Sequence, residues 1–153
     1  AEFSKIEPDY KLTIYGEGRE REKLEKLIFN LNLENSVELP GRDKNVLNKI
    51  NSASGFILSS DYEGMPNALI EAMCMGMPVI STDCPSGGPR EFIKSGENGI
   101  LVSVGDKEDL VKAMKIMTVS SLAEKFAENA GKLRLTLTDT DTFEKWRKYL
   151  FNE

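Results

Sequence analysis

Two glutamates flank a short segment whose residue types suit the binding of hydroxyl groups and of an anion. Glu63 stands in a turn-forming stretch, and Glu71 follows it inside an apolar helical pattern that starts at about Pro66. Carboxylates at the two ends of such a segment can each accept hydrogen bonds from a pair of neighbouring hydroxyls, which sugars and ribose offer. Backbone N–H groups at a helix start lack intrahelical partners and can converge on an anion. Those predicted to do so belong to Gly64, Met65, Asn67 and Ala68.

The spacing of these two carboxylates is not specific by itself. The chain has 25 acidic residues, so two glutamates at this separation are easily found. Glu63 as a solvated loop acid and Glu71 as an exposed helical acid therefore stay open as interpretations. Gly64 favours a binding role, because a glycine lets a ligand approach the backbone closely.

A second glycine-rich turn, Gly16-Glu17-Gly18, follows an expected strand. The third glycine of a dinucleotide-binding fingerprint would fall at position 21, which is Arg21, so that fingerprint fails. Acidic residues crowd the following helix start, where they would repel a pyrophosphate. The sequence also lacks the Gly-rich P-loop motif, which excludes that form of phosphate chemistry.

Charge and composition narrow the function classes. The chain has 20 basic and 25 acidic residues, a net charge of −5 and no histidine. Histidine-dependent catalysis, metal ligation and pH switching are therefore excluded for this chain. Residues 51–100 hold only Arg90 and Lys94 as cations, against six acids. Binding to nucleic acid is disfavoured, because it requires a basic face.

Cysteine usage and hydropathy bear on location. Cys74 and Cys84 show no C-x-x-C spacing, which favours a reduced, cytoplasmic chain with both thiols buried or half-buried. No apolar run reaches the length of a membrane span, and no signal peptide is evident.

We expect this chain to bind neither a metal nor a cofactor. Because residues 1–6 resemble the end of an amphipathic helix and lack an initiating methionine, we expect a piece of a longer protein.

Short β-branched runs alternate with helical patterns along all 153 residues, which suit one domain. Short links between them are typical of an α/β fold, a Rossmann-like doubly wound parallel sheet with helices on both faces. The expected strands are residues 11–15, 36–39, 55–58, 79–82 and 100–102. The expected helices are residues 19–33, 46–50, 66–75, 90–94, 120–131 and 142–151. A further helix is expected to begin at Asp106, which forms a capping-box pattern with Asp109.

Ligands of open parallel sheets bind beyond the carboxyl ends of the strands. The loops expected there are residues 16–19, 40–43, 59–67 and 83–90. The paired glutamates lie in the third of these loops and in the helix after it.

Three segments follow one another in an order that is more specific than any one of them. Residues 63–72 read Glu-Gly-Met-Pro-Asn-Ala-Leu-Ile-Glu-Ala, residues 75–83 read Met-Gly-Met-Pro-Val-Ile-Ser-Thr-Asp, and residues 87–93 read Gly-Gly-Pro-Arg-Glu-Phe-Ile. This order resembles the carboxyl-terminal domain of the retaining group 1 glycosyltransferases of the GT-B architecture, which has two Rossmann-like domains. Their E-x(7)-E motif matches Glu63 and Glu71. The resemblance extends through residues 14–18, 39–42, 98–102 and 146–151.

The resemblance implies a site for a nucleotide-diphosphate sugar, with an amino-terminal acceptor domain absent from this chain. Glu63, the catalytic candidate, would contact the hydroxyls of the donor sugar, and Glu71 those of the ribose. The segment of Gly64, Met65, Pro66 and Asn67 would hold the diphosphate or sugar through its amides. Gly16, Gly41 and Arg42 match the loops that line the base.

The implied reaction is transfer of a hexosyl group, with retention, from a UDP-linked sugar to a glycan or lipid-linked acceptor in polysaccharide biosynthesis. The loop at residues 85–89 looks like that of transferases with such acceptors. Membrane association, peripheral and at the inner face, is expected only for the full-length protein.

The sequence departs from the family at the cations. The Arg/Lys pair that grips the diphosphate in the family lies upstream of the segment that resembles residues 1–6, so this chain lacks it. Arg42 is expected to stack on a base or order a loop, and Arg90 to begin a helix. A sugar-nucleotide epimerase or phosphorylase of the same architecture, or a non-catalytic flavodoxin-like binding module, remains an alternative.

Overall fold

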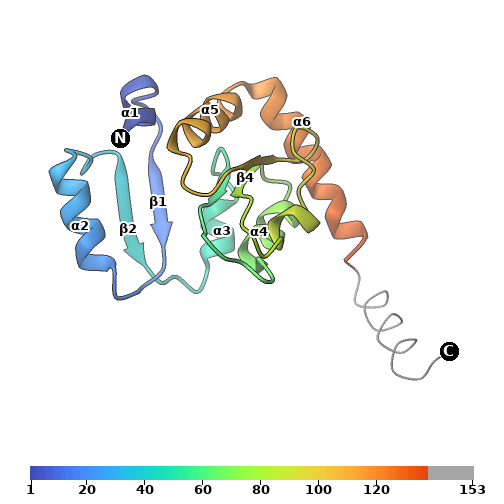
Figure 1. Ribbon diagram of the computed structural model, residues 1–153, viewed down its shortest axis with the longest axis horizontal. Coiled ribbons are helices and arrows are strands. Elements are labelled where there is room, and N and C mark those ends of the chain that lie inside the picture. Colours follow the sequence, from blue (N-terminus) through green and yellow to red (C-terminus); the bar gives the residue numbers. More distant parts are fainter. Residues whose placement is uncertain (138–153) are drawn as a thin grey trace. The chain divides into compact units, whose positions relative to one another are not determined.

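A computed structural model of the protein describes residues 1–137 (Figure 1). The chain divides into two compact units, unit 1 (Ala1–Ser52) and unit 2 (Ala53–Glu153). The helix predicted at residues 142–151 lies outside the described residues.

Unit 1 contains a pair of parallel strands. Its elements are α1 (Glu2–Ile6), β1 (Leu12–Tyr15), α2 (Arg21–Asn30), β2 (Val37–Gly41) and α3 (Val46–Ile50). In the register of β1 with β2, Leu12 lies opposite Val37 and Tyr15 opposite Gly41. Strand β2 continues through Pro40, which the sequence placed after the strand. Among the described residues β2 pairs only with β1, and an edge strand tolerates a proline that cannot donate a hydrogen bond.

Helix α2 is shorter at both ends than the predicted 19–33. The Arg21 amide bonds to the Gly18 carbonyl at 3.2 Å, so the preceding residues form a turn rather than a helical start. At the other end Asn32 adopts φ 52°, the left-handed conformation in which helices commonly end.

Unit 2 holds three parallel strands in the order β3-β4-β5. Its elements are β3 (Phe56–Leu58), α4 (Asn67–Cys74), β4 (Val79–Thr82), the 3-10 turn η1 (Pro89–Glu91), β5 (Ile100–Val102), α5 (Lys107–Met117), α6 (Ser120–Gly131) and the 3-10 turn η2 (Lys132–Leu135). All four residues of the central strand β4 are buried, so both of its faces are covered. Burial on both faces is expected for the central strand of a parallel sheet, and it includes the polar residues Ser81 and Thr82.

The core of unit 2 joins the sheet to the two long helices. It comprises Ile80, Val102, Ala113, Met117 and Phe126, against which Ile57, Ile100, Leu110 and Met114 also pack. Helix α4 contributes three further buried side chains and contacts both β3 and β4. The start of α4 is thereby fixed at the carboxyl end of β3, where the paired glutamates were predicted.

The predicted α/β class with parallel strands is confirmed, and hydrogen bonding divides the strands between a two-stranded and a three-stranded sheet among the described residues. Asp106 caps α5 as predicted, since its Oδ1 accepts the Asp109 amide at 2.9 Å. The reciprocal bond of a capping box is not made, because the Asp106 amide donates to the Ser103 carbonyl instead. The predicted helix at residues 90–94 is replaced by the 3-10 turn Pro89–Glu91.

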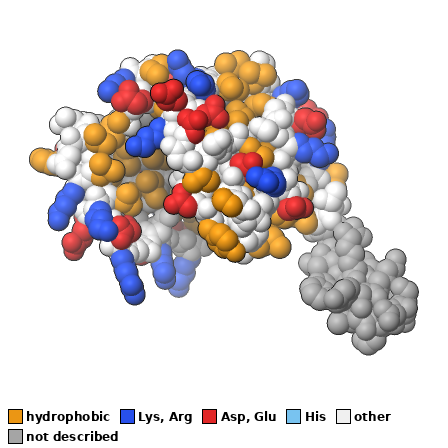
Figure 2. All heavy atoms as spheres, in the orientation of Figure 1, with side chains coloured by type: hydrophobic (Ala, Val, Ile, Leu, Met, Phe, Trp, Pro, Cys, Tyr) orange, Lys and Arg blue, Asp and Glu red, His pale blue; other side chains and the backbone are white. Residues whose placement is uncertain are grey.

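No helix within residues 1–137 combines the length and apolar character needed to cross a bilayer. Lys and Arg side chains on the face shown in Figure 2 are interspersed with acidic and apolar ones.

Candidate functional site

Glu63 is held by two serine side chains. The Ser60 hydroxyl donates to Glu63 Oε1 at 2.7 Å, which fixes one carboxylate oxygen. The Ser86 hydroxyl donates to the Glu63 carbonyl at 2.7 Å and accepts from the Glu63 amide at 3.1 Å. Ser86 is 23 residues away in the chain. Glu63 is therefore an ordered, half-buried residue rather than a freely solvated loop acid.

The segment between Glu63 and α4 exposes a row of backbone donors. No described hydrogen bond within residues 1–137 uses the amides of Gly64, Met65, Ala68 or Leu69. The N-cap residue, Pro66, supplies no side-chain acceptor to this helix end. Unpaired N–H groups at a helix start favour negative charge, so the segment is suited to an anion without any lysine.

The predicted role of the Asn67 amide is wrong. This amide donates to the Met65 carbonyl at 2.9 Å. Pro66, at φ −82° and ψ 70°, has the dihedral angles of an inverse γ-turn, in which a hydrogen bond joins the residues on either side. Asn67 can still contribute its side-chain carboxamide, because the residue is exposed.

Glu71 lies on the exposed side of α4. In a helix, positions three and four apart share a face, so Glu71 shares its face with Asn67 and Ala68, which are also exposed. Its carboxylate makes no hydrogen bond or ion pair with the described part of the chain. The structure thus places a solvent-facing carboxylate one turn beyond the free amide of Ala68.

The loop after β4 lies against the Glu63–Gly64 backbone. A Cβ on Gly88 would lie 2.5 Å from the Gly64 carbonyl oxygen and closer still to that of Glu63. Only glycine permits this approach. Within the same loop, Arg90 Nε pairs with Asp83 Oδ1 at 2.7 Å. Arg90 therefore orders its own loop and follows the first residue of a 3-10 turn, in place of the predicted helix start.

In unit 1 the structure brings Gly16 and Gly41 together. The Gly16 amide donates to the Gly41 carbonyl at 2.9 Å. Gly41 has φ 84° and is buried against the Glu17 side chain, whose Oε1 would lie 2.5 Å from a Cβ at position 41. Arg42, next along the chain, is exposed and makes no side-chain interaction with residues 1–137. Its predicted stacking on a base stays a prediction.

Arg21, which sequence reasoning did not select, organises this turn. It donates to Glu17 Oε1, to Glu25 Oε1 and to the Leu39 carbonyl, each at 2.9 Å. The signal that could have identified it is the placement of two acids four residues to either side. A hollow of about 200 Å³ is lined by Ile14, Tyr15, Gly16, Glu17, Gly18, Glu20, Arg21, Leu24 and Leu39.

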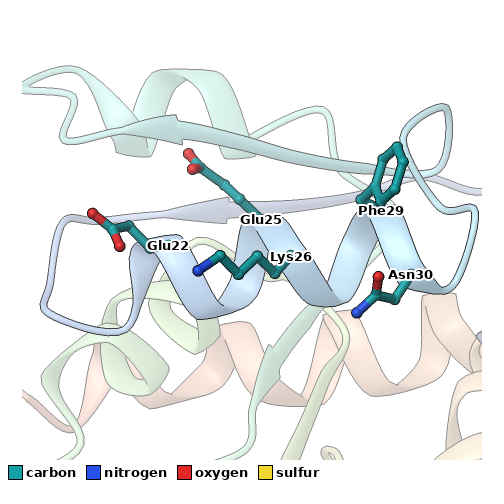
Figure 3. Close-up of a pocket in the computed structure, with 5 residues that line it drawn as sticks. All are labelled: Glu22, Glu25, Lys26, Phe29 and Asn30. Atoms are coloured by element: carbon teal, nitrogen blue, oxygen red, sulfur yellow. The ribbon is translucent and has the colours of Figure 1, made fainter.

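A larger hollow, of about 430 Å³, lies elsewhere in unit 1 and includes no predicted site residue. Figure 3 shows its lining residues projecting from the single helix α2: Glu22, Glu25, Lys26, Phe29 and Asn30. Because one helix forms its wall, we treat it as an open surface depression. Residues 1–137 contain no group of three acidic, cysteine or histidine side chains arranged to hold a metal ion.

Comparison with known proteins identifies the family to which the sequence is similar. The sequence model described as "Glycosyl transferases group 1" matches residues 1–133 of the chain. An uncharacterized glycosyltransferase of Methanocaldococcus jannaschii is 46% identical over 86 residues, which are 56% of this chain and 21% of that protein.

Two further matches cover more of the chain. The first is N-acetylgalactosamine-N,N'-diacetylbacillosaminyl-diphospho-undecaprenol 4-alpha-N-acetylgalactosaminyltransferase of Campylobacter jejuni, 34% identical over 90% of this chain and 37% of that enzyme. The second is the crystal structure of an S. aureus TarM variant in complex with Fondaparinux, alpha-GlcNAc-glycerol and UDP. It superimposes with a TM-score of 0.89 at 30% identity, over 99% of this chain and 31% of that one. The chain thus spans well under half the length of these relatives.

Proposed function

This chain belongs to the group 1 glycosyltransferases, and from that premise we propose that it is the donor-binding domain of a hexosyltransferase. The proposed donor is a nucleotide-diphosphate sugar, UDP-linked, and the proposed acceptor is a glycan or lipid-linked sugar of polysaccharide biosynthesis. The names of the Campylobacter jejuni relative and of the UDP-bound TarM structure support these choices. An amino-terminal domain that binds the acceptor would complete the enzyme, in the cytoplasm.

The observation that carries the proposal is the row of unpaired amides between two carboxylates. In the proposed complex the amides of Gly64, Met65 and Ala68 hold the diphosphate. Glu63, fixed by Ser60, receives hydroxyls of the sugar. Glu71 is proposed to bind the ribose hydroxyls. Asn67, through its carboxamide, and Pro66, through the turn it forms, are proposed to contact the diphosphate or the sugar. Gly16, Gly41 and Arg42 are proposed to contact the base.

These groups act on charge that develops during transfer. In a retaining transfer, the bond between the sugar and the diphosphate breaks through an oxocarbenium-like state, and negative charge accumulates on the leaving phosphate. Preorganised backbone donors stabilise such charge better than mobile water does, because they need no reorientation. Further cations from the full-length protein would add to this stabilisation. We propose that Glu63 orients the sugar.

The alternatives predict different products. An epimerase of the same architecture would convert the sugar nucleotide without an acceptor, and a phosphorylase would release a sugar phosphate. A non-catalytic module would bind without turnover. The family match favours transfer.

Product analysis with the natural full-length protein tests the proposal. A UDP-hexose labelled in the sugar is incubated with and without a lipid-linked or oligosaccharide acceptor, and products are separated and examined by NMR. We expect label in a glycosidic bond of the same anomeric configuration as the donor, and only when acceptor is present. Label recovered as an epimer or as free sugar phosphate would contradict the proposal.

A further inference from the structure

Ser86 lies outside the paired-glutamate motif and yet contacts both backbone polar groups of Glu63. We propose that Ser86 is a positioning residue that orients Glu63 toward the donor sugar, so that the loop after β4 governs how strongly the sugar itself is bound. This inference rests on the proposed function, since it assigns Glu63 to the sugar. Ser86 would touch neither donor nor acceptor.

The contact has the form of a two-point clamp. A serine hydroxyl has one proton to donate and lone pairs to accept. Here the proton goes to the Glu63 carbonyl, 2.7 Å away, and a lone pair receives the Glu63 amide at 3.1 Å. Cys84 Sγ, at 3.5 Å, is a weaker competing acceptor for the same proton. One side chain thereby restrains both peptide groups of Glu63 and limits its rotation.

The clamp is attached to a well-anchored loop. The Asp83 amide donates to the Val102 carbonyl of β5 at 2.8 Å, and the Gly87 amide donates to the Cys84 carbonyl at 2.9 Å. The missing side chain of Gly88 allows the loop to lie directly on the carbonyls of residues 63 and 64. The position of Ser86 is therefore set by the sheet, and it transmits that position to Glu63.

The carboxylate is restrained from the other side. Ser60 donates to Glu63 Oε1, and the Ser60 carbonyl accepts from Thr82 Oγ1 at 2.5 Å, at the end of β4. With its backbone and one oxygen held, Glu63 keeps its second carboxylate oxygen, Oε2, free of described hydrogen bonds within residues 1–137.

Loss of the hydroxyl should change orientation more than folding. The Ser86–Glu63 bonds lie at an exposed site, so water can replace them in a Ser86→Ala variant. Glu63 would then sample several orientations, and its hydrogen bonds to the sugar would weaken. Contacts of the nucleotide with Glu71 and with the helix amides do not pass through Ser86. The affinity for a sugar nucleotide should therefore fall more than that for the nucleotide alone.

The test compares four proteins by calorimetric titration with UDP and with UDP-hexose: wild type, Ser86→Ala, Ser86→Thr and the control Ser103→Ala. Ser103 is exposed and its side chain makes no described hydrogen bond within residues 1–137. We expect Ser86→Ala to weaken UDP-hexose binding by about tenfold and UDP binding by less than about twofold. Ser86→Thr, which keeps the hydroxyl, should restore the affinity, and Ser103→Ala should match wild type.

Hydrogen exchange of the Glu63 amide, followed by NMR, is measured on the same proteins. Exchange should accelerate in Ser86→Ala and not in Ser86→Thr. Two results for Ser86→Ala would overturn the positioning role. One is an equal loss of affinity for UDP and for UDP-hexose. The other is an unchanged affinity for UDP-hexose although the Glu63 amide exchanges faster. If wild type binds neither ligand, the proposed function fails, and amide exchange then decides alone whether Ser86 holds Glu63.

Discussion

Substitution of Gly88 tests the close approach of two loops on which the site depends. In Gly88→Ala the new Cβ would lie 2.5 Å from the Gly64 carbonyl oxygen and 3.2 Å from the Glu63 carbonyl carbon. Both neighbours are backbone atoms, so neither can rotate away. The φ of Gly88 is −49°, which alanine adopts readily. The effect of the substitution is therefore steric.

The expected change in the free energy of unfolding follows from the contact between the loop after β4 and residues 63 and 64, which the new Cβ would force apart. Overpacking of this kind costs about 1 to 3 kcal/mol. The two Ser86–Glu63 hydrogen bonds are exposed and water can replace them, so their loss adds little to this cost. The reduced freedom of the unfolded chain returns about 0.4 to 1 kcal/mol. We expect a net loss of about 0.5 to 2.5 kcal/mol in the free energy of unfolding, which lowers Tm by about 2 to 10 °C.

Gly64→Ala is the matched control for this prediction. A Cβ at position 64 meets nothing within 4 Å, so only the reduced freedom of the unfolded chain remains, and the free energy of unfolding should rise by about 0.4 to 1 kcal/mol. Urea and thermal unfolding followed by circular dichroism measure both variants. If Gly88→Ala and Gly64→Ala unfold at the same urea concentration and temperature, the loop does not lie against residues 63 and 64, and the geometry of the site is wrong.

Two further predictions concern unit 2 outside the site. Asp106→Ala removes the acceptor that caps α5 and should lower the free energy of unfolding, measured with urea, by about 1 kcal/mol. The control Asp109→Asn keeps the capped amide and should lower it by less than half of that. Equal losses in the two variants would contradict the cap. Burial raises the pKa of the Cys74 thiol above its ordinary value of 9.0, so the folded chain holds this proton to higher pH than the unfolded chain does. The contribution of this thiol to the free energy of unfolding should decline as the pH rises past the pKa of the unfolded chain. The rate of alkylation of Cys74, measured against pH in a Cys84→Ser variant, should have its midpoint at a higher pH in the folded chain than in the urea-unfolded chain. Equal midpoints would refute the raised pKa.

Local patterns were sufficient for three elements of unit 2. The strands Val79–Thr82 and Ile100–Val102 and the helix Ser120–Gly131 match their predicted bounds. The two strands are short runs rich in β-branched residues that follow a glycine- or proline-containing turn, and the helix is an amphipathic run that ends at Gly131. The prediction failed at helix ends such as that of α2, where a turn and a left-handed Asn32 override the apolar periodicity.

The placement of the candidate residues on the fold could be predicted only where they are close in sequence. Glu63, Gly64 and Glu71 stand in one segment, so their arrangement on a loop and a helix could be inferred. The bonds of Ser86 to Glu63 join residues 23 apart, and no local pattern specifies such a contact. The Asn67 amide was wrongly expected to be free because the γ-turn depends on the ψ of Pro66, which proline leaves undetermined.

The central claim is that the amide row and its carboxylates bind a nucleotide sugar. Calorimetric titration of this chain with UDP-hexose tests it most directly, with wild type, Glu71→Gln and the control Glu124→Gln. Glu124 is the fifth residue of α6, as Glu71 is of α4, and both are exposed.

We expect wild type and Glu124→Gln to bind with about millimolar affinity. Glu71→Gln should bind at least about tenfold more weakly, because charged acceptors form the stronger hydrogen bonds. Equal binding by all three proteins, or no binding by wild type, would contradict the claim.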